Sequence, residues 1–344
     1  MPENLDQPLV SVVTPVYNTG EYLEQCIKSV LSQTYRNLEY IILDNCSTDD
    51  SLAIANRYAS IDNRIRVIQN STFLNQIQNY NQSVRHISEN SKYCKIVQAD
   101  DGLYPDCLTQ MVKIAESNQT IGMVGAFTLL DFGNRADVYL MGLPYSKSSY
   151  KGLYICRRYL LEGFDVFGSP TATLLRSKIV RSRQNLYNEN SAVDDTSLCI
   201  EVLKSWDFGF CHQVLTYTRR DNESLMTILK QYNFHILTRY IILKKYGRDI
   251  LSEDEYSKCE EQIEKMYHIV IGESILTRLP DEFWQFQDFA LKEIDEKIDK
   301  RKKYIWAFQA AIELALNPKS TLERLTQHRK RKESSLDVEK YIDI

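Results

Sequence analysis

Lys95-Ile96-Val97-Gln98-Ala99-Asp100-Asp101-Gly102 contains the clearest local indication of how this chain folds. Its short apolar run ends in two adjacent carboxylates, and an amphipathic segment follows Pro105. A short apolar run that stops at acidic residues predicts a buried strand that carries them to the edge of a sheet. Ligands of open α/β sheets bind at the carboxyl edge, so we expect Asp100 and Asp101 to face a ligand there. A solvated acidic turn would give the same local pattern, and the rest of the chain has to decide between the two.

Two neighbouring carboxylates repel each other, so a positively charged partner is expected at this pair. Ligand sets made only of oxygen favour a hard divalent ion such as Mg²⁺ or Mn²⁺, shared with phosphate oxygens. The pair therefore predicts a metal-assisted phosphate site.

Earlier in the chain, strands and helices alternate. Apolar, β-branched runs predict strands near residues 9–14, 39–43 and 65–68, and helical periodicity follows each run. We expect Ser47–Asp50 to open the second helix as a capping box. This order predicts a parallel sheet with right-handed crossovers. The strand at 39–43 also ends in an acid, Asp44, so Asp44 and the Asp100–Asp101 pair should meet at one edge.

The following hundred residues add two apolar strands, near 121–132 and 208–218, around a region rich in turns. Gly168-Ser169-Pro170-Thr171 predicts a tight turn near the site. A second acidic pair, Asp194-Asp195, comes just before a helix. Acids at a helix start also stabilise the helix without any chemistry, so this pair has two explanations.

From about Ser224 proline and glycine become rare, and apolar residues recur at helical spacing, which predicts three or four helices to the end. We therefore expect a catalytic domain at 1–222, with a nucleotide-binding half at 8–120 and an acceptor half at 121–222, and a helical region at 223–344. Basic clusters at 301–303 and 329–332 flank an apolar stretch. A solvated helix face and a contact with a membrane surface both fit these clusters.

Composition excludes several classes of protein. The formal net charge is −4 and the isoelectric point is near 5.9, which does not indicate a nucleic-acid binder. The eight cysteines contain no C-x-x-C pair, which argues against a structural zinc site or a disulfide framework and suits a reducing cytosol. The polar first seven residues do not resemble a signal peptide, and no apolar run approaches the roughly 20 residues of a membrane span. We expect a cytoplasmic protein, soluble or peripheral at the inner membrane face.

Four segments together resemble the ordered motifs of glycosyltransferase family 2. In chain order they are Val12–Asn18, Leu43–Asp49, Gln98–Asp101 and Asp194–Asp195. Each motif is weak alone, but four in this order over about residues 8–220 make the resemblance specific. It implies the GT-A fold, a Rossmann-like mixed α/β sheet for nucleotide-diphospho-sugars, here with an α-helical C-terminal extension. It also implies sugar transfer with inversion.

The resemblance implies a role for each motif. The nucleotide-binding residues would be Thr14, Pro15, Tyr17, Asp44, Asn75 and Asp100. Tyr17 would stack on the base and Asp44 would accept a hydrogen bond from it, usually from a uracil N–H. Asp101 would bind Mn²⁺ or Mg²⁺, which neutralises charge on the departing nucleotide. Asp195 would be the base that takes the acceptor's proton, whereas Asp194, Gly168 and Ser169 would lie near the acceptor or donor sugar.

The chain departs from the family pattern in several places. Gln98 stands where the metal motif often has aspartate, and Tyr80 stands where arginine is common. The stretch at 217–222 lacks the family's histidine. Arg219 or Arg220 could reach the diphosphate, and surface pairing with Asp221 is equally compatible with the sequence.

The predicted function is a metal-dependent, inverting glycosyltransferase that moves a sugar from a UDP-sugar to a glycan or lipid-linked acceptor in cell-surface polysaccharide or glycoconjugate synthesis. The alternative is a catalytically silent nucleotide-sugar-binding or scaffold protein. A nucleotidyltransferase needs a glycine-rich basic loop after the first strand, and residues 14–20 hold one glycine and no basic residue. A dinucleotide oxidoreductase fails because no G-x-G-x-x-G follows a strand. The oligomeric state is left open.

Overall fold

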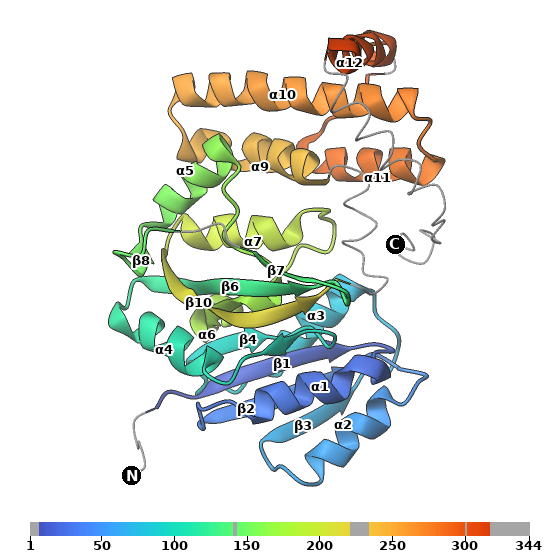
Figure 1. Cartoon of the computed structure of the whole chain (residues 1–344). Helices are drawn as coiled ribbons and strands as arrows, with labels where there is room; N and C mark the ends of the chain where they lie inside the picture. The colour runs from blue at the N-terminus through green and yellow to red at the C-terminus, as the bar shows by residue number, and fades with distance from the viewer. Residues whose placement is uncertain (1–6, 140–142, 221–233, 300, 317–344) are drawn as a thin grey trace. The chain divides into compact units, whose positions relative to one another are not determined.

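The computed structural model describes residues 7–139, 143–220, 234–299 and 301–316 (Figure 1). The chain forms two compact units. We call the first the sheet unit; it comprises residues 1–159, 164–189 and 194–222. The second, the helical unit, comprises 160–163, 190–193 and 223–344. Two short segments from the middle of the chain thus belong with the C-terminal helices.

The sheet unit begins with alternating strands and helices, as predicted. Its first elements are β1 (Val10–Val16), α1 (Gly20–Leu31), β2 (Leu38–Asp44), α2 (Ser51–Ala59), β3 (Ile65–Gln69), α3 (Gln76–Val84), β4 (Tyr93–Ile96), β5 (Gly102–Leu103) and α4 (Cys107–Ser117). Strands β3, β2, β1 and β4 lie in that order and are all parallel. The register pairs Val16 with Asp44 and Asp44 with Gln69, so Asp44 lies at the carboxyl edge.

The second half of this unit makes the sheet mixed. Its elements are β6 (Ile121–Asp131), β7 (Ala136–Tyr139), β8 (Ser149–Tyr150), α5 (Gly152–Glu162), the 3₁₀ turn η1 (Pro170–Ala172), β9 (Thr173–Arg176), α6 (Ser177–Arg181), α7 (Asp194–Leu203) and β10 (Asp207–Arg219). Strand β9 is antiparallel to both β4 and β6, whereas β10 runs parallel to β6. A mixed α/β sheet was predicted, and it is confirmed.

Helices cover both faces of the sheet because alternate strand residues point in opposite directions. Val12, Val16 and Ile42 belong to one buried core, together with residues of α1 and α4 such as Ile27 and Met111. Val13 and Ile41 are buried outside that core, and α3 contacts β1 and β2. Figure 1 shows α1 and α2 in front of the blue strands. The parallel part of the sheet is therefore covered on both faces, and ligands can reach it at its edges.

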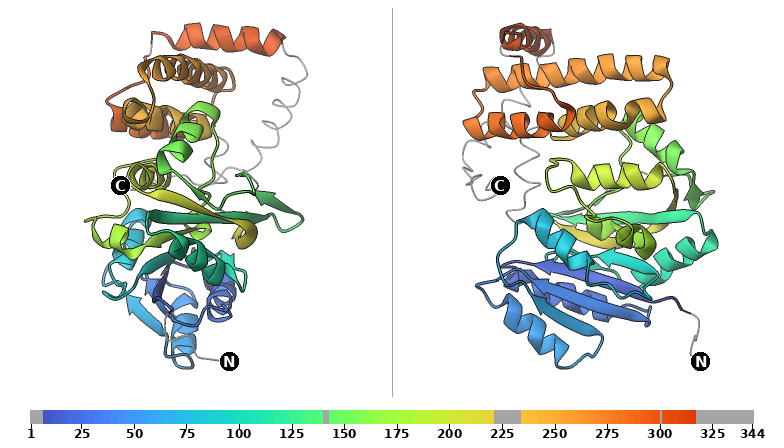
Figure 2. Two further views of the ribbon diagram at one scale, coloured as in Figure 1. Left: turned by 90° about the vertical axis from the view of Figure 1, so that its left-hand side faces the viewer. Right: turned by 180° about the vertical axis from the view of Figure 1, so that it is seen from behind.

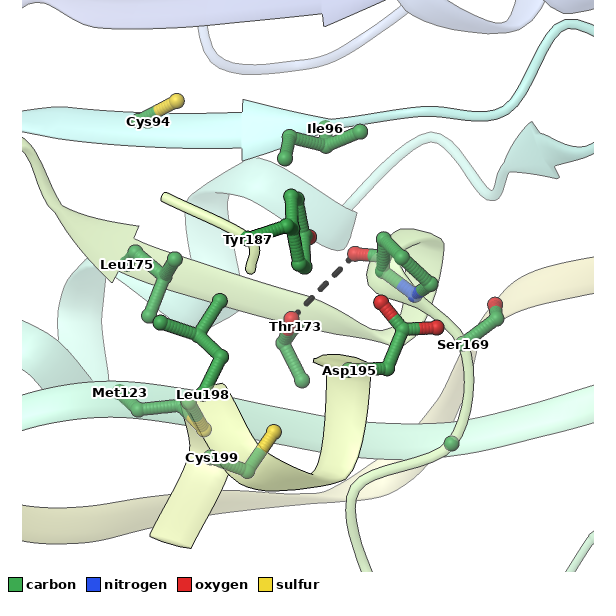
Figure 3. Close-up of a pocket in the computed structure, with 12 residues that line it drawn as sticks. Cys94, Ile96, Met123, Ser169, Thr173, Leu175, Tyr187, Asp195, Leu198 and Cys199 are labelled. Atoms are coloured by element: carbon green, nitrogen blue, oxygen red, sulfur yellow. Dashed lines mark hydrogen bonds between the residues drawn. The ribbon is translucent and has the colours of Figure 1, made fainter. Parts of the chain in front are cut away.

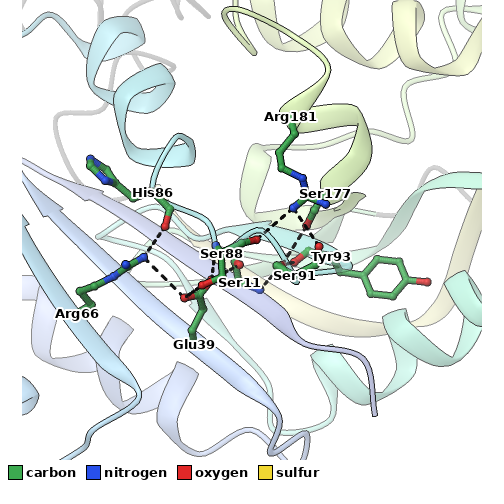
Figure 4. A network of polar contacts seen from close by, with 9 residues as sticks. All are labelled: Ser11, Glu39, Arg66, His86, Ser88, Ser91, Tyr93, Ser177 and Arg181. Carbon is green, nitrogen blue, oxygen red and sulfur yellow. Dashed lines mark hydrogen bonds and ion pairs between the residues drawn. The ribbon is translucent and has the colours of Figure 1, made fainter. Parts of the chain in front are cut away.

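The amino edge of the parallel strands is closed by a polar network (Figure 4). Glu39 accepts hydrogen bonds from Ser88 N–H at 2.8 Å and Ser88 Oγ at 2.7 Å, and it pairs with Arg66 at 3.7 Å. Ser91 Oγ accepts from Ser11 N–H at 3.2 Å, and Arg181 donates to the carbonyl of Ser91 at 3.1 Å. These groups satisfy one another, as buried polar groups in folded proteins usually do, and they hold the amino ends of the strands together.

The start of α2 differs from the prediction. The expected capping box at Ser47–Asp50 is wrong, because Asp50 is the N-cap of α2 and makes no side-chain cap bond. Asp49 instead accepts from Gly20 N–H at 2.8 Å and Ser51 N–H at 3.0 Å, which ties the first loop to α2. Capping boxes occur at Asn75, which opens α3, and at Ser252. Asn75 thus has a structural role that its sequence context did not indicate.

The helical unit contains α9 (Phe234–Ile250), α10 (Glu253–Leu276), α11 (Asp281–Leu291), the 3₁₀ turn η2 (Lys292–Ile294) and α12 (Lys303–Leu316). Helix α10 contacts both α9 and α12, and Figure 2 shows α9 and α10 side by side. Three or four helices were predicted, and four α-helices occur in the described part after 233. The predicted helical residues at 225–232 and the basic cluster at 329–332 lie outside the described residues. Within the described ranges no helix combines the length and apolarity needed to cross a bilayer.

Candidate active site

Asp44 has one carboxylate oxygen without a partner. Its Oδ2 accepts from Ser47 N–H at 3.2 Å and from the Gln69 amide at 3.5 Å. Its Oδ1 is buried and makes no hydrogen bond. A buried carboxylate oxygen without a donor costs free energy that a ligand N–H can recover. The end of β2 therefore holds a carboxylate oxygen whose hydrogen-bonding capacity is unused.

Two exposed rings lie beside each other in the same unit. Tyr17 follows β1 and is 45% exposed, and Phe73 is 59% exposed in the loop after β3. Their centroids are 4.8 Å apart at an interplanar angle of 60°. Asn45 holds the second loop, since its side chain donates to Leu74 O at 2.7 Å and accepts from Leu74 N–H at 3.0 Å. Sequence reasoning missed Phe73, although an exposed ring within the polar run 69–76 was a usable signal.

Three other residues expected to bind the nucleotide have different surroundings. Thr14 is fully buried, and its hydroxyl lies 3.0 Å from the Tyr40 hydroxyl. Pro15 is buried in β1 opposite Leu43. Asn75 accepts from Gln78 N–H at 2.9 Å as the cap of α3. Thr14 and Pro15 are thus enclosed in the sheet, and the side-chain oxygen of Asn75 serves as a helix cap.

Asp101 is buried at the junction of two strands. It precedes β5, which pairs with β10, so Thr218 Oγ1 donates to Oδ2 and Arg219 N–H donates to Oδ1, each at 3.2 Å. Gly102 permits this pairing because a Cβ there would lie 2.2 Å from the ring of Tyr217. Burial, and then the charge of Asp100, raise the pKa of Asp101. The site thus concentrates negative charge that a cation would stabilise.

These residues suit a metal held jointly with a substrate. Within the ranges that the structure describes, no three His, Cys, Asp or Glu side chains form a metal-binding group. Asp100 and Asp101 could supply one or two carboxylate ligands. Mg²⁺ is typically held in this way, with phosphate oxygens and waters completing its coordination.

A loop from 168 to 173 is fixed close to Asp101. Gly168 has a left-handed φ of +67°, and Ser169 Oγ lies 3.4 Å from Thr218 Oγ1. Thr171 Oγ1 accepts from Gln98 N–H at 3.0 Å. The fully buried ammonium of Lys95 donates to the carbonyls of Thr171 and Thr173, the latter at 2.9 Å. Sequence reasoning missed this role of Lys95, although a lysine within an apolar strand was a visible anomaly.

Asp195 lies in the first turn of α7 at a pocket whose empty volume, including the open solvent at its mouth, is about 380 Å³ (Figure 3). The residues lining it are Cys94, Ile96, Met123, Gly168, Ser169, Pro170, Thr173, Leu175, Tyr187, Asp195, Leu198 and Cys199. Asp195 is exposed, and the desolvation of its carboxyl by the protein atoms packed around it raises its pKa to about 6. Three residues predicted on separate grounds, Gly168, Ser169 and Asp195, therefore share one pocket.

Tyr80 connects the two acidic pairs. It is buried, its ring packs edge-on against Tyr187 at 5.9 Å, and burial raises its pKa well above the usual value. The charges of Asp195, Asp100 and Asp101 all act on its hydroxyl in the same direction. Because such effects fall off with distance, Asp195 and the Asp100–Asp101 pair both lie near the Tyr80 hydroxyl.

The two arginines after β10 have different surroundings. Arg219 donates to Gln25 at 2.9 Å, and its guanidinium lies 4.6 Å from the centre of the Tyr22 ring. Burial lowers the pKa of Arg220, and the charges of Asp101 and Asp100 oppose that change. Arg220 is therefore the guanidinium near the acidic pair. Asp221, the alternative surface partner, lies outside the described residues.

Comparison with known sequences gives a consistent set of relatives. The family model described as glycosyl transferase family 2 matches residues 11–181. "Glycosyltransferase GlyG" of Streptococcus pneumoniae is 38% identical over 33% of the chain and 38% of that protein. The "Uncharacterized glycosyltransferase MJ1057" of Methanocaldococcus jannaschii is 35% identical over 76% of the chain and 78% of that protein. The "Putative teichuronic acid biosynthesis glycosyltransferase TuaG" of Bacillus subtilis is 48% identical over 18% of the chain and 25% of that protein. The chain spans 38% to 56% of the length of GlyG and two further curated relatives.

Solved structures share the fold at low sequence identity. TarS 1–349 of S. aureus with UDP-GlcNAc superposes with a TM-score of 0.56 at 13% identity, over 84% of the chain and 89% of that structure. The mannosyltransferase PcManGT of Pyrobaculum calidifontis with GDP-Man and Mn²⁺ gives 0.56 at 14% identity, over 96% and 86%. At this level of identity the likeness concerns the fold.

Proposed function

Because the chain belongs to glycosyltransferase family 2 and has the GT-A fold, we propose that it is an inverting enzyme that uses a nucleotide-diphosphate sugar. The expected donor is a UDP-sugar, and the acceptor is a hydroxyl of a glycan or lipid-linked sugar in cell-surface polysaccharide or glycoconjugate synthesis. The observation that supports the proposal is geometric: Ser169 lines the same pocket as Asp195, and its hydroxyl lies 3.4 Å from Thr218 Oγ1, which donates to Asp101.

The nucleotide would bind at the ends of β1 and β2. The free Oδ1 of Asp44 suits a base N–H, and the exposed rings of Tyr17 and Phe73 suit stacking. The relatives support a nucleotide-sugar but differ in the base, since TarS was solved with UDP-GlcNAc and PcManGT with GDP-Man. A uracil donates its N3–H to a single acceptor, which fits the single unpaired oxygen.

The diphosphate would lie near Asp100 and Asp101, which would hold Mn²⁺ or Mg²⁺ with it. Bound there, the metal would stabilise negative charge on the leaving diphosphate. The PcManGT complex with Mn²⁺ supports this assignment. Arg220 supplies a further positive charge near the acidic pair.

Asp195 would act as the general base. Its carboxylate would take the proton of the acceptor hydroxyl as that oxygen attacks the anomeric carbon. The bond from this carbon to the diphosphate oxygen would break on the opposite side, so the configuration inverts, as in inverting glycoside hydrolysis with water as the attacking group. Gly168 and Ser169 line the same pocket and would contact a sugar, and Asp194 would orient the segment or touch the acceptor.

Turnover with a panel of nucleotide-sugars, acceptors and Mn²⁺ or Mg²⁺ tests this proposal. Asp195→Asn should lower kcat about 100- to 10,000-fold while donor affinity is retained, because it removes only the base. Asp50→Asn is a matched control, since Asp50 also starts a helix and makes no side-chain cap bond. A wild-type protein that binds nucleotide but transfers no sugar would favour the silent binding or scaffold protein. Unchanged turnover in Asp195→Asn would remove the assignment of the base.

Helix α12 supports a further part of this proposal, namely peripheral contact with the inner face of the cytoplasmic membrane. Five exposed apolar side chains share an arc of about 120° on this helix. They are Tyr304, Ile305, Phe308, Ile312 and Leu316. The exposed basic residues Arg301 and Lys302 precede them. An apolar face beside basic residues is typical of helices that lie on anionic lipid.

Flotation with phosphatidylglycerol-rich vesicles at low salt tests the contact. The full chain should float, and Ile305→Asp with Phe308→Asp should abolish flotation. Met266→Asp is the control, because Met266 is an exposed apolar residue of α10 outside this face. A wild-type chain that stays at the bottom of the gradient contradicts the membrane proposal and leaves the transferase proposal unaffected.

A further inference from the structure

Glu293 is a buried carboxylate in the turn η2 of the helical unit, and its side chain is 5% exposed. Oε1 accepts from Ala192 N–H at 2.6 Å, and Oε2 accepts from Ser191 Oγ at 2.9 Å. The ammonium of Lys245 in α9 lies 3.0 Å from Oε2. Charged hydrogen bonds of this kind are among the stronger ones in proteins, and the lysine compensates the buried negative charge.

The groups held by Glu293 belong to three consecutive residues. Ser191 Oγ donates to the carboxylate and also accepts from Val193 N–H at 3.0 Å. One carboxylate therefore holds Ser191 and Ala192 directly and Val193 through a hydroxyl. The next residue, Asp194, is the first of α7, and Asp195 follows it. The segment 190–193 belongs to the helical unit, and the chain enters the sheet unit at Asp194.

The other short segment of the helical unit, 160–163, is also held by polar groups of the C-terminal helices. Arg239 Nη2 donates to Leu160 O at 3.0 Å, and Cys259 Sγ donates to the same carbonyl at 3.3 Å. This segment, 160–163, leads toward Gly168 and Ser169. Both stretches that the helical unit holds thus lead into residues that line the pocket at Asp195.

We propose that Glu293 is a positioning residue for Asp195: it fixes the segment Ser191–Val193, which directly precedes α7 and the proposed base. The inference rests on the role given to Asp195 above. It assigns to the C-terminal helices a part in catalysis that is separate from any acceptor or membrane contact.

The physical reason is the strict geometry of proton transfer. A base must lie within hydrogen-bond distance of the hydroxyl it deprotonates, and a displacement of about 1 Å can cost about 100-fold in rate. Asp195 lies in the first helical turn, so a shift in the preceding three residues moves its backbone directly. Substitution of Glu293 by glutamine removes the charge and turns an amide N–H₂ toward donors, which breaks at least one of the contacts.

Steady-state kinetics with the full chain test the proposal. Glu293→Gln should lower kcat about 10- to 100-fold, and donor KM and nucleotide affinity should stay within twofold of the wild type. Ser191→Ala, which removes the shared hydroxyl without a change in charge, should have an effect of the same kind. In an Asp195→Asn background, Glu293→Gln should cause no further loss of rate, because it acts only through Asp195. An equal loss in both backgrounds, or a wild-type kcat in Glu293→Gln, overturns the proposal.

Glu260→Gln is the matched control. Glu260 pairs with Lys244 at 2.9 Å in the same unit, and none of its described bonds involves 190–193. It should keep the wild-type kcat. Amide hydrogen exchange at Ala192 and Val193 separates this inference from the proposed function, since it needs no substrate. Faster exchange in Glu293→Gln than in Glu260→Gln supports the fixing of Ser191–Val193 by Glu293, even if no sugar transfer is found. Equal exchange in the two variants overturns it.

Discussion

Asp195 combines access to solvent with a surrounding of apolar and aromatic side chains. Tyr80 and Tyr187 and the thiol of Cys199 all respond to its charge, and burial raises the pKa of each of these groups well above its usual value. They therefore remain neutral at physiological pH. The carboxyl of Asp195 is then the group of this pocket that titrates in the acidic range.

The pH dependence of kcat follows from this environment. A base must be ionised to accept a proton, so kcat should rise about tenfold per pH unit below a pKa of about 6 and level off above it. The measurement is kcat from pH 4.5 to 8.5 at saturating donor, acceptor and Mn²⁺, the metal keeping Asp101 ionised. Asp50→Asn should keep the profile. A rate that is constant between pH 5 and 8 contradicts this prediction.

Asp44 leads to a prediction about nucleotide affinity. Asp44→Asn removes the charge of a buried carboxylate whose Oδ1 makes no hydrogen bond, and a charged hydrogen bond contributes about 1.5–3 kcal/mol. Nucleotide affinity measured by calorimetry should therefore fall about 10- to 100-fold. Asp62→Asn is the control, because Asp62 pairs with Arg64 at 2.7 Å just before β3, at its amino end. Equal affinities of the two variants would argue against a ligand at Asp44.

For single residues, the sequence indicated the acidic side chains of the candidate site but not the residues that hydrogen-bond to them or hold nearby loops. Asp44 and the pair at 100–101 follow apolar runs, and strand ends in a parallel sheet share an edge, so their meeting could be predicted. Lys95 and Thr218 could not be assigned, because their partners lie 76 and 117 residues away along the chain. A role that depends on such a pairing leaves no local pattern.

Among the elements, long periodic segments were predicted best. The parallel strands β1 to β4 and the helices between them were expected from apolar periodicity and are confirmed. Strands β5 and β9 were not expected individually, because they span two and four residues and are defined by antiparallel pairing with distant strands. The misplaced capping box has a similar cause, since Asp49 binds Gly20 N–H in place of a helix end.

The pairing of α10 with α12 leads to a prediction about stability. A Cβ on Gly272 would lie 2.2 Å from the backbone carbonyl oxygen of Trp306, which cannot rotate away. Gly272→Ala should therefore destabilise the chain by about 1–3 kcal/mol despite its better helix propensity. Gly247→Ala is the matched control, because there the nearest atoms belong to the side chains of Leu243 and Tyr256. Thermal unfolding should show a clear drop in Tm for Gly272→Ala and a smaller change for the control, and equal changes would contradict the prediction.

At the scale of the molecule, the notable feature is that the helical unit is not contiguous in sequence. It includes 160–163 and 190–193, which carry the buried residues Leu160 and Val193. No change in composition marks these stretches, so they could not be separated from their neighbours before the structure was known. Their membership depends on contacts with residues more than 70 positions later, such as Arg239 and Glu293.

A chain that ends at residue 222 should therefore be less stable than the full chain. Exposure of the buried side chains of Leu160 and Val193 should lower the free energy of unfolding by about 3–6 kcal/mol. This corresponds to a drop in Tm of about 10 °C. Calorimetry of the full chain should give one transition whose calorimetric and van't Hoff enthalpies agree. A chain that ends at residue 316 keeps the described partners of both stretches and is the control. An unchanged Tm after removal of 223–344 would show that these stretches fold without their partners.

Segments 160–163 and 190–193 belong to the helical unit although they lie far from it in sequence. This limits how this enzyme can be recombined with its relatives. In a chimera spliced only at residue 222, Leu160 and Ser191 would come from this chain. Their partners, the counterparts of Arg239 and Glu293, would come from the relative. Such hybrids should express poorly or transfer sugar slowly. This should hold whichever acceptor is used by the relative that supplies the C-terminal helices. Engineers who graft C-terminal helices onto this scaffold should therefore transplant three pieces of sequence together.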